Sequence, residues 1–349
     1  MRIAQVAPLY EAVPPKLYGG TERVVAHLTD ALVGLGHDVT LFSSADAQTL
    51  ATLAPVRDQA IRLDPAPLKS DLAAHLTQLY EVRRRAAEFD VIHFHTDMIQ
   101  FPMFEDMAER TITTLHGRLD LKDLPEVYRR WPQFPLVSIS DDQRRPLPFG
   151  NWAATVHHGM STELYRFSPR GQGYLAFLGR ISPEKRPDRA IAIATAAGRS
   201  LRIAAKVDNA DRSYFDATIE PLLHNPLVRF VGEIGDTEKS AFLGGADALL
   251  FPIDWPEPFG LVMIEAMACG TPVIAWENGS VPEVVEDGVT GFIVRSEAEA
   301  RDAVFRLPEL DRRAIRARFE ERFSAVAMAR RYLEIYQRLP QSAPLTEAA

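Results

Sequence analysis

Several features that would point to other classes of protein are missing from this chain of 349 residues. It has one cysteine, Cys269, so no disulfide can form within the chain. Its 39 Lys and Arg are outnumbered by 47 Asp and Glu, and the net charge of -8 argues against a nucleic acid or an anionic membrane surface as partner. No apolar run approaches the ~20 residues of a membrane span. The start, MRIAQVAPLY, lacks the charged lead and long apolar core of a signal peptide. We therefore expect a cytoplasmic protein with no membrane span.

The length and the 46% hydrophobic content allow a large buried core, and a chain of this size usually divides into two domains. The segment Phe167–Gly173 contains Pro and Gly and is polar, which suits an exposed connection. We expect an N-terminal domain over 1–166, a C-terminal domain over 167–325, and a terminal helix and tail over 326–349 that packs back on the N-terminal domain. The last residues, 341–349, read as a frayed tail.

Short apolar runs alternate with helical patterns along the whole chain, which predicts an α/β fold of parallel sheets covered by helices on both faces. Two doubly wound, Rossmann-like domains follow, with ligands expected at the carboxyl ends of the strands, in a cleft between the domains. Clear helices are expected at 21–35 and 71–88, and terminal helices at 311–338. The expected strands are 2–7, 38–43, 90–95, 111–115 and 136–140 in the first half, and 174–178, 201–206, 228–231, 248–251, 272–275 and 291–294 in the second half.

A cation pair follows the first strand of the second half, in Gly179-Arg180-Ile-Ser-Pro-Glu-Lys185-Arg-Pro187. Pro187 suits the first turn of a helix. A guanidinium can hold phosphate oxygens in a bidentate fork and an ammonium can add a point charge, so Arg180 and Lys185 could neutralise a diphosphate without a metal. Taken alone, the segment could equally be a solvated loop with ordinary surface cations.

Two carboxylates lie further along, in Asp254-Trp-Pro-Glu257-Pro-Phe-Gly260 and at Glu265. Prolines on both sides of Glu257 stiffen its loop, and Gly260 opens a helix that ends at Gly270. The free N–H groups at such a helix start favour an anion. Glu265 lies within that helix among apolar residues, where a carboxylate needs a partner such as a ribose diol. Alternatively, it pairs with an arginine or lies on an exposed stripe.

The stretch from Asp254 to Gly291 resembles the signature of the family 4 retaining glycosyltransferases, which have the two-domain GT-B fold. The spacing of Glu257 and Glu265 carries the resemblance together with Gly179-Arg180…Lys185, Ala-Cys-Gly-Thr-Pro-Val-Ile and Val281-Pro-Glu283. The resemblance implies that Arg180 and Lys185 bind a donor diphosphate, Glu257 the hydroxyls of the transferred sugar, and Glu265 the ribose. It also implies donor-binding residues at the helix start, in the first half and beside the base: Phe259, Gly260, Leu261, Val262, Gly19, Gly20, Gly232 and Glu233.

The first half offers a glycine loop and a histidine. Gly19 and Gly20 let backbone approach a ligand, and Thr21 is the expected N-cap of the following helix. The loop lacks the three-glycine spacing of a dinucleotide site, so no nicotinamide cofactor is inferred. His116 ends a strand, and by the resemblance it hydrogen-bonds the donor sugar near its primary hydroxyl. His93, His95 and Asp97 share one strand face, a spacing that invites zinc, although core or acceptor-site histidines are the preferred interpretation.

Two segments depart from the pattern of the family. Lys206-Val-Asp-Asn stands where members commonly carry a Gly-rich turn, and His157-His158-Gly-Met-Ser stands where an Asn-Gly-Val-Asp run is usual. The first departure puts the shape of the nucleotide pocket in question. A basic amphipathic helix of the kind that relatives with lipid acceptors use is hard to find in the first half, which favours a soluble acceptor.

The resulting prediction is a metal-independent, retaining hexosyltransferase that needs no cofactor. Its co-substrate is a nucleotide diphosphate sugar, with UDP-glucose favoured over GDP-mannose, and its acceptor is a saccharide, natural product or other small molecule. We expect a monomer or weak dimer that binds no nucleic acid. The alternatives are a sugar-nucleotide 2-epimerase of the same fold, which would isomerise its product without an acceptor, and a non-catalytic nucleotide-sugar-binding subunit.

Overall fold

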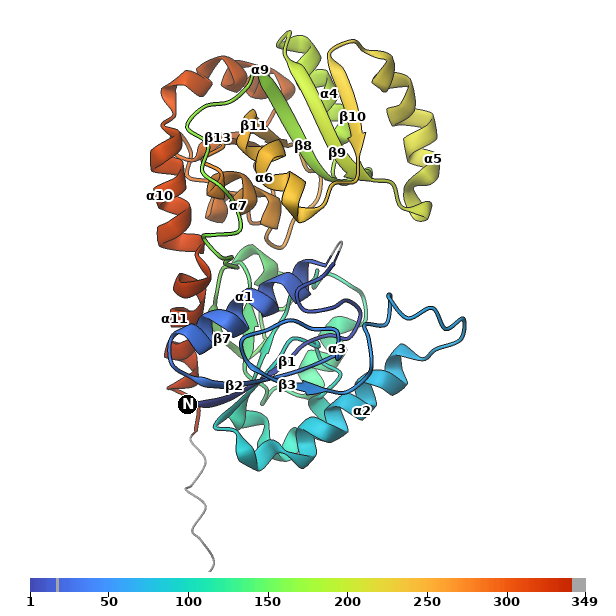
Figure 1. The fold of residues 1–349 in the computed structure, drawn as a ribbon, viewed down its shortest axis with the longest axis vertical. Helices are drawn as coiled ribbons and strands as arrows, with labels where there is room; N and C mark the ends of the chain where they lie inside the picture. The colour runs from blue at the N-terminus through green and yellow to red at the C-terminus, as the bar shows by residue number, and fades with distance from the viewer. Residues whose placement is uncertain (17–18, 341–349) are drawn as a thin grey trace, which may run out of the picture. The chain divides into compact units, whose positions relative to one another are not determined.

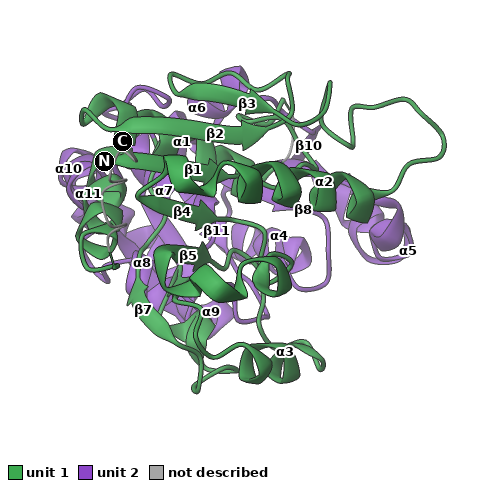
Figure 2. Cartoon of the chain, turned by 90° about the horizontal axis from the view of Figure 1, so that it is seen from below, with its two compact units in different colours: residues 1–160, 325–349 green, residues 161–324 purple. Residues whose placement is uncertain are grey.

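The computed structural model describes residues 1–16 and 19–340, and the expected tail at 341–349 lies outside the described residues. The chain forms two compact units, each with its own parallel sheet (Figure 1). Unit 1 comprises residues 1–160 together with the C-terminal segment from Ala325, and unit 2 comprises Ser161–Ser324, as the two colours of Figure 2 show. The last helix of the chain therefore belongs to the unit that contains the first strand.

Unit 1 is built on a sheet of seven parallel strands in the order β3-β2-β1-β4-β5-β6-β7. The order changes direction between β1 and β4, and the crevice at such a point is where ligands of these sheets bind. The strands are β1 (Arg2–Val6), β2 (Asp38–Ser43), β3 (Thr52–Pro55), β4 (Val91–Phe94), β5 (Thr111–Thr114), β6 (Leu136–Ser138) and β7 (Trp152–Thr155).

The helices of unit 1 cover this sheet, and the C-terminal helix packs against α1. Buried side chains such as Val82, Phe94 and Leu136 form a core between sheet and helices. The helices are α1 (Gly20–Gly34), α2 (Asp71–Arg84), α3 (Leu124–Arg130) and α11 (Ala325–Tyr336), with short 3₁₀ segments η1 (Ala86–Glu88), η2 (Phe101–Met103), η3 (Glu105–Arg110) and η4 (Asp142–Arg144).

Unit 2 has a sheet of six parallel strands in the order β10-β9-β8-β11-β12-β13. Its direction changes between β8 and β11, so the loops that follow these two strands emerge side by side. The strands are β8 (Tyr174–Arg180), β9 (Ser200–Lys206), β10 (Val228–Gly232), β11 (Ala246–Phe251), β12 (Val273–Trp276) and β13 (Gly291–Val294).

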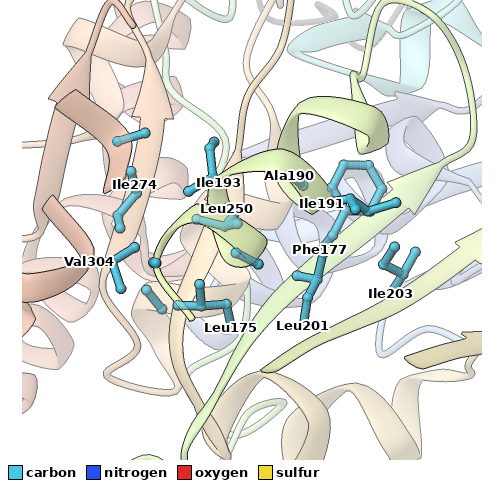
Figure 3. Packing of buried hydrophobic residues seen from close by; sticks show 14 of the residues in the cluster. Leu175, Phe177, Ala190, Ile191, Ile193, Leu201, Ile203, Leu250, Ile274 and Val304 are labelled. Carbon is cyan, nitrogen blue, oxygen red and sulfur yellow. The ribbon is translucent and has the colours of Figure 1, made fainter. Parts of the chain in front are cut away.

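The core of unit 2 lies between its sheet and the helices α4 and α9. Phe177 on β8, Ile191 on α4 and Ile203 on β9 belong to one cluster of buried side chains (Figure 3). Strands covered on both faces consist almost entirely of apolar residues, which is why β8 and β11 are visible in the sequence. The helical segments are α4 (Pro187–Ala196), η5 (Asn209–Asp211), α5 (Arg212–Tyr214), the π-helical η6 (Phe215–Ile219), η7 (Glu220–His224), α6 (Asp236–Gly244), α7 (Leu261–Ala268), α8 (Val281–Val284), α9 (Glu297–Arg306), η8 (Leu307–Glu309) and α10 (Arg312–Phe323).

The expected α/β class with two doubly wound domains is confirmed, and some details of the prediction are wrong. Thr21 is not the N-cap of the first helix, because the helix begins at Gly20 and Gly19 takes the cap position. The strand expected to end at Leu178 continues to Arg180, so Arg180 belongs to β8 and not to the loop that follows. The helix expected over 71–88 ends at Arg84 and is followed by η1. Within the described part of the chain, every helix is too short or too polar to cross a lipid bilayer.

Candidate active site

The loop between β8 and α4 is held against the loop that follows β11. Arg186 occupies the N-cap of α4 with a left-handed backbone (φ 53°), and Pro187 starts the helix. The Arg186 guanidinium pairs with Asp188 at 2.8 Å and with Asp254 at 3.1 Å. The Asp254 N–H donates to the carbonyl oxygen of Glu184 at 2.8 Å. The strained cap residue thus ties the two loops at the point where the strand order reverses.

Lys185 and Glu257, which come from these two loops, are in direct contact. The Lys185 ammonium forms an ion pair with Oε2 of Glu257, and the side chains keep only 17% and 12% of their surface exposed. The indole N–H of Trp255 donates to the same oxygen at 3.0 Å, and the ammonium lies 5.1 Å from the centroid of that indole ring. The structure therefore brings together two of the side chains singled out in the sequence, in a cation–π and carboxylate environment.

The backbone of Glu257 is supported by the residues before α8. The Ser280 N–H donates to the Glu257 carbonyl at 3.0 Å, and the Ser280 hydroxyl donates to the Phe259 carbonyl at 2.8 Å. Gly279 has a left-handed backbone (φ 55°), and a Cβ there would overlap the Glu257 backbone and lie 2.7 Å from the Pro256 carbonyl carbon. Gly279 and Ser280 therefore position the Glu257 loop, and the segment Val281-Pro-Glu283 begins immediately after them.

Helix α7 begins directly after this loop. Gly260 takes the N-cap with a left-handed backbone (φ 78°), and a Cβ there would lie 2.9 Å from Cε of Met263. Helix geometry leaves the N–H groups of the first turn, at Leu261 and Val262, without acceptors inside the helix. These groups and the positive end of the helix dipole suit an anion.

Glu265 lies on α7 and is nearly buried, with 6% of its side chain exposed. Lys239, on α6, places its ammonium 3.4 Å from Oε1 of Glu265 and 3.4 Å from Asp236. The burial of Glu265 excludes the alternative that it lies on an exposed stripe. Its cationic partner is a lysine, whereas an arginine was considered in the sequence analysis. Nothing in the sequence singled out Lys239, because its partner lies on a different helix.

Arg180 faces carboxylates from three positions. Its guanidinium lies 3.1 Å from Glu184, 3.9 Å from Asp208 and 4.0 Å from Asp211. Asp208 also pairs with Lys206 at 2.9 Å. The segment that departs from the Gly-rich turn of the family thus supplies one acidic group, Asp208, to the environment of Arg180, and Asp211 follows shortly after it.

Gly232 and Glu233 lie apart from this group of contacts. Gly232 is the last residue of β10, the edge strand next to β9, and has a left-handed backbone (φ 78°) with open space where a Cβ would lie. Glu233 follows it and is exposed. Both positions are at the carboxyl end of the sheet, which leaves their backbone accessible to a ligand.

The glycine loop of unit 1 leads into α1. Gly19 lies against Pro15 and Glu11, since a Cβ there would be 2.8 Å from Cβ of Pro15 and 3.2 Å from Cγ of Glu11. Gly20 is the first residue of the helix, and residues 17 and 18 lie outside the described residues. Burial raises the pKa of the Glu22 carboxyl, and the nearby Glu11 carboxylate adds to this effect. Glu11 itself pairs with Arg62 at 3.0 Å.

His116, which follows β5, belongs to a group of four histidines with His93 on β4, His95 at the end of β4 and His158 after β7. Its Nε2 is 2.8 Å from Nδ1 of His95, and its ring stacks on that of His158 with centroids 5.1 Å apart. Burial lowers the pKa of His116 to about 3. Burial and the neighbouring histidines lower the pKa values of His93, His95 and His158 well below their ordinary range. All four rings are therefore neutral at pH 7.

The zinc alternative for His93, His95 and Asp97 has no support in the geometry. Both ring nitrogens of His93 and of His95 lie at hydrogen-bond distance from other side chains. In the two described stretches of the chain, no three or more His, Cys, Asp or Glu side chains are grouped so that they could hold a metal ion.

Comparisons with known proteins agree with this architecture. The model of "Glycosyltransferase Family 4" matches residues 18–211, and that of "Glycosyl transferases group 1" matches residues 166–321. A glycogen synthase of Mycobacterium tuberculosis is 28% identical over 83% of this chain and 81% of its own length. A phosphatidyl-myo-inositol mannosyltransferase of Mycobacterium leprae is 26% identical over the full length of both chains.

A solved structure shows the same fold over nearly the whole chain. The glycosyltransferase AviGT4, involved in avilamycin A biosynthesis, superimposes with a TM-score of 0.70 at 26% identity and covers 97% of each chain. The two parallel sheets, the position of the loops after β8 and β11 and the matches over both halves all lead to one assignment. Since the family 4 model alone matches more than half of the chain, this protein belongs to glycosyltransferase family 4 and is a glycosyltransferase of the GT-B fold.

Proposed function

We propose that this glycosyltransferase moves a hexose, with retention of configuration, from a nucleotide diphosphate sugar to an acceptor hydroxyl without a metal ion. UDP-glucose is the favoured donor and GDP-mannose the alternative. The observation that carries the proposal is the contact of Lys185 with Glu257 beside the start of α7. A cation, a carboxylate and helix N–H groups at the carboxyl ends of β8 and β11 suit a sugar diphosphate.

Each group has a defined part in the proposed reaction. The charge that develops on the leaving diphosphate is stabilised by Lys185, by Arg180 and by the first N–H groups of α7, in the manner of an oxyanion hole. Glu257 accepts hydrogen bonds from hydroxyls of the transferred sugar, and Glu265, held by Lys239, accepts from the ribose. His116 binds a hydroxyl of the donor sugar. The leaving phosphate helps to take the acceptor proton, so no side chain needs to form a covalent intermediate.

The named relatives support a polyol or saccharide as acceptor. They include a glycogen synthase, a phosphatidyl-myo-inositol mannosyltransferase and a D-inositol 3-phosphate glycosyltransferase of Actinosynnema mirum, whose names give three different acceptors. Acceptor choice therefore varies among proteins of this similarity. We propose a small saccharide or other hydroxyl-bearing molecule for this chain.

The first experiment screens UDP-glucose, GDP-mannose and related nucleotide sugars by thermal shift, and then measures release of the nucleoside diphosphate with and without saccharide acceptors. Lys185→Ala is expected to lower the transfer rate by about 10²- to 10³-fold, because a preorganised charge that faces the leaving group is lost. Its free energy of unfolding should fall by only about 1–2 kcal/mol, since Glu257 keeps its bond from Trp255.

Arg199→Ala is the matched control. Arg199 is also an ion-paired cation of unit 2, but it precedes β9 and pairs with Asp247 at the amino ends of the strands. The control should lose stability and keep its transfer rate. Wild-type turnover in Lys185→Ala would refute the diphosphate assignment. Tight nucleotide binding without any release would favour the binding subunit, and isomerisation of the sugar without an acceptor would favour the epimerase.

A further inference from the structure

Seven polar side chains form a continuous hydrogen-bonded chain inside unit 1. It starts at His116, whose Nε2 lies 2.8 Å from Nδ1 of His95, and continues from Nε2 of His95 to Oε1 of Gln5 at 2.8 Å. The Gln5 amide nitrogen donates to the Tyr336 hydroxyl at 3.1 Å, and this hydroxyl lies 2.7 Å from Nδ1 of His93. The chain ends with Thr114 and Tyr332. Thr114 Oγ1 is 2.7 Å from Nε2 of His93 and 2.8 Å from the Tyr332 hydroxyl.

The side chain of Gln5 sets the direction of these hydrogen bonds. Its Oε1 can only accept, so Nε2 of His95 carries a proton and donates to it. Its amide nitrogen can only donate, so the Tyr336 oxygen accepts from it, and the same hydroxyl lies at hydrogen-bond distance from Nδ1 of His93. The Tyr336 hydroxyl thus holds the nitrogen end of the Gln5 amide, and the oxygen end faces His95.

The same direction reaches His116. A neutral imidazole has one donor and one acceptor, so with its proton on Nε2, His95 accepts at Nδ1. Burial and the adjacent histidines keep His95 neutral, because they lower its pKa well below the ordinary value. Nε2 of His116 must then be the donor in the bond between the two rings. Its Nδ1 is left as an unprotonated acceptor.

That acceptor has no hydrogen-bond partner among the residues that the structure describes, although it is shielded from solvent. Buried polar groups are nearly always paired, so an unpaired one calls for an explanation. Six buried residues with polar groups, from β1, β4, β5, α11 and the end of β4, form the chain of bonds that reaches this ring through His95, and an apolar core would need none of them. The chain of bonds therefore supports the His116 ring and leaves its Nδ1 available to a ligand.

We propose that Gln5, His95 and Tyr336 are positioning residues that hold His116 in its Nε2-protonated form, so that Nδ1 accepts a hydrogen bond from a hydroxyl of the bound sugar. This inference rests on the proposed function for the identity of the hydroxyl, and on the described hydrogen bonds for the state of the ring. It places α11, from the other end of the chain, in the support of the site. The hydroxyl donates its proton to Nδ1, and no covalent step is involved.

The first test reads the state of the ring without any substrate. Two-bond ¹⁵N–¹H correlation spectra of the ¹⁵N-labelled protein report which nitrogen of each histidine carries the proton. The proposal requires a protonated Nε2 and an unprotonated Nδ1 on His116 in the wild-type protein. A proton on Nδ1 would overturn it, whatever the donor of the enzyme is.

The second test uses two tyrosines of α11. Tyr336→Phe removes the hydroxyl that orients Gln5, so His116 should become a mixture of its two ring forms. Release of UDP from UDP-glucose should slow roughly three- to tenfold, the effect of weakening one hydrogen bond, while the Kd of UDP, which lacks the sugar, stays unchanged. Tyr332→Phe is the control, because it removes an equally buried hydroxyl of the same helix at the far end of the chain of bonds.

The outcomes separate this inference from the proposed function. The proposal fails if Tyr336→Phe and Tyr332→Phe give the same spectra and rates, or if both lose the same activity. The chain of bonds would then serve only the packing of the core. Gln5→Leu provides a second variant with the expected behaviour of Tyr336→Phe if that variant folds poorly. The wild-type protein could turn over neither UDP-glucose nor any other donor and still carry its His116 proton on Nε2. That result would refute the proposed function and leave the assignment of the His116 ring intact.

Discussion

The Lys185 ammonium and the Glu257 carboxylate, which lie 72 positions apart in the sequence, form an ion pair between the loops that follow β8 and β11. A cation that binds a diphosphate must leave or share this carboxylate when the donor arrives. Under the proposed function, the pair would hold Lys185 in place before the donor binds and would compete with the diphosphate for the charge of Lys185.

Glu257→Gln should separate these two effects. Removing the negative charge frees Lys185, so the affinity for UDP should rise roughly three- to tenfold, as measured by isothermal titration calorimetry. The transfer rate should fall nonetheless, because under the proposed role the variant loses a charged acceptor for the hydroxyls of the sugar.

Asp254→Asn is the matched control for this variant, since it removes a carboxylate of the same loop that pairs with Arg186. It should leave UDP affinity near the wild-type value. Weaker UDP binding in Glu257→Gln would show that the carboxylate supports the diphosphate site and does not compete for Lys185.

Arg180 is expected to contribute less to donor binding than Lys185 because of the acidic residues around it. Asp211 lies 4.0 Å from its guanidinium and repels a diphosphate that approaches the same group. Asp211→Asn should therefore raise UDP affinity about two- to fivefold, in keeping with a partly exposed charge pair. The gain should shrink at high salt.

Asp216→Asn makes the same change of charge at an exposed position of η6, in the same segment. Titration calorimetry at two salt concentrations compares the two variants. An equal gain in both would trace the effect to net charge, and no gain in either would place Arg180 outside the diphosphate site.

The sequence was sufficient for the elements whose side chains are buried on both faces. Strands β2 and β13 begin and end where predicted, because most of their side chains are buried and form short, largely apolar runs. Strands β3 and β7 were missed. They lie at the two edges of the seven-stranded sheet and are only partly buried, so they have no continuous apolar run, and β3 ends in Pro55.

The candidate site was predictable where one short segment carries several signals. Glu257 is found from the prolines and glycine around it, and Lys185 from its place after a buried strand. Contacts between separate helices and strands could not be predicted from such local signals. The partner of Glu265 on α6, the carboxylates around Arg180 and the bond from Gln5 to Tyr336 depend on the tertiary fold. The last of these joins residues that are 331 positions apart.

Gly279→Ala should inactivate the enzyme indirectly, by displacing the loop that carries Glu257. A Cβ at this position would overlap the Glu257 backbone, so the loop must move or the chain must leave its left-handed conformation. We expect a large loss of transfer rate together with a loss of about 1–3 kcal/mol in the free energy of unfolding. Steady-state kinetics and urea denaturation measure the two effects.

Gly288→Ala is the comparison for the backbone term alone. Gly288 has a similar left-handed backbone (φ 74°), but nothing lies within 4 Å of the place where a Cβ would be. This variant should lose about 1 kcal/mol of stability and keep its rate. Equal rate losses in both variants would show that strain, and not displacement of Glu257, is responsible.

Protonation of the buried histidines should make the fold less stable in mild acid. The pKa of His116 is lowered from its ordinary value of 6.5 to about 3, so between these pH values the unfolded chain binds a proton that the folded chain does not. The free energy of unfolding therefore rises with pH across this window and is lost as pH falls from 6.5 toward 3. A single such group contributes up to about 1.4 kcal/mol per pH unit.

His116→Gln tests this contribution. Its free energy of unfolding, measured by urea denaturation between pH 4 and 7, should depend less steeply on pH than that of the wild-type protein, because glutamine does not titrate. Paired carboxylates contribute equally to both proteins and cancel in the comparison. Identical slopes would mean that His116 takes up its proton in the folded state.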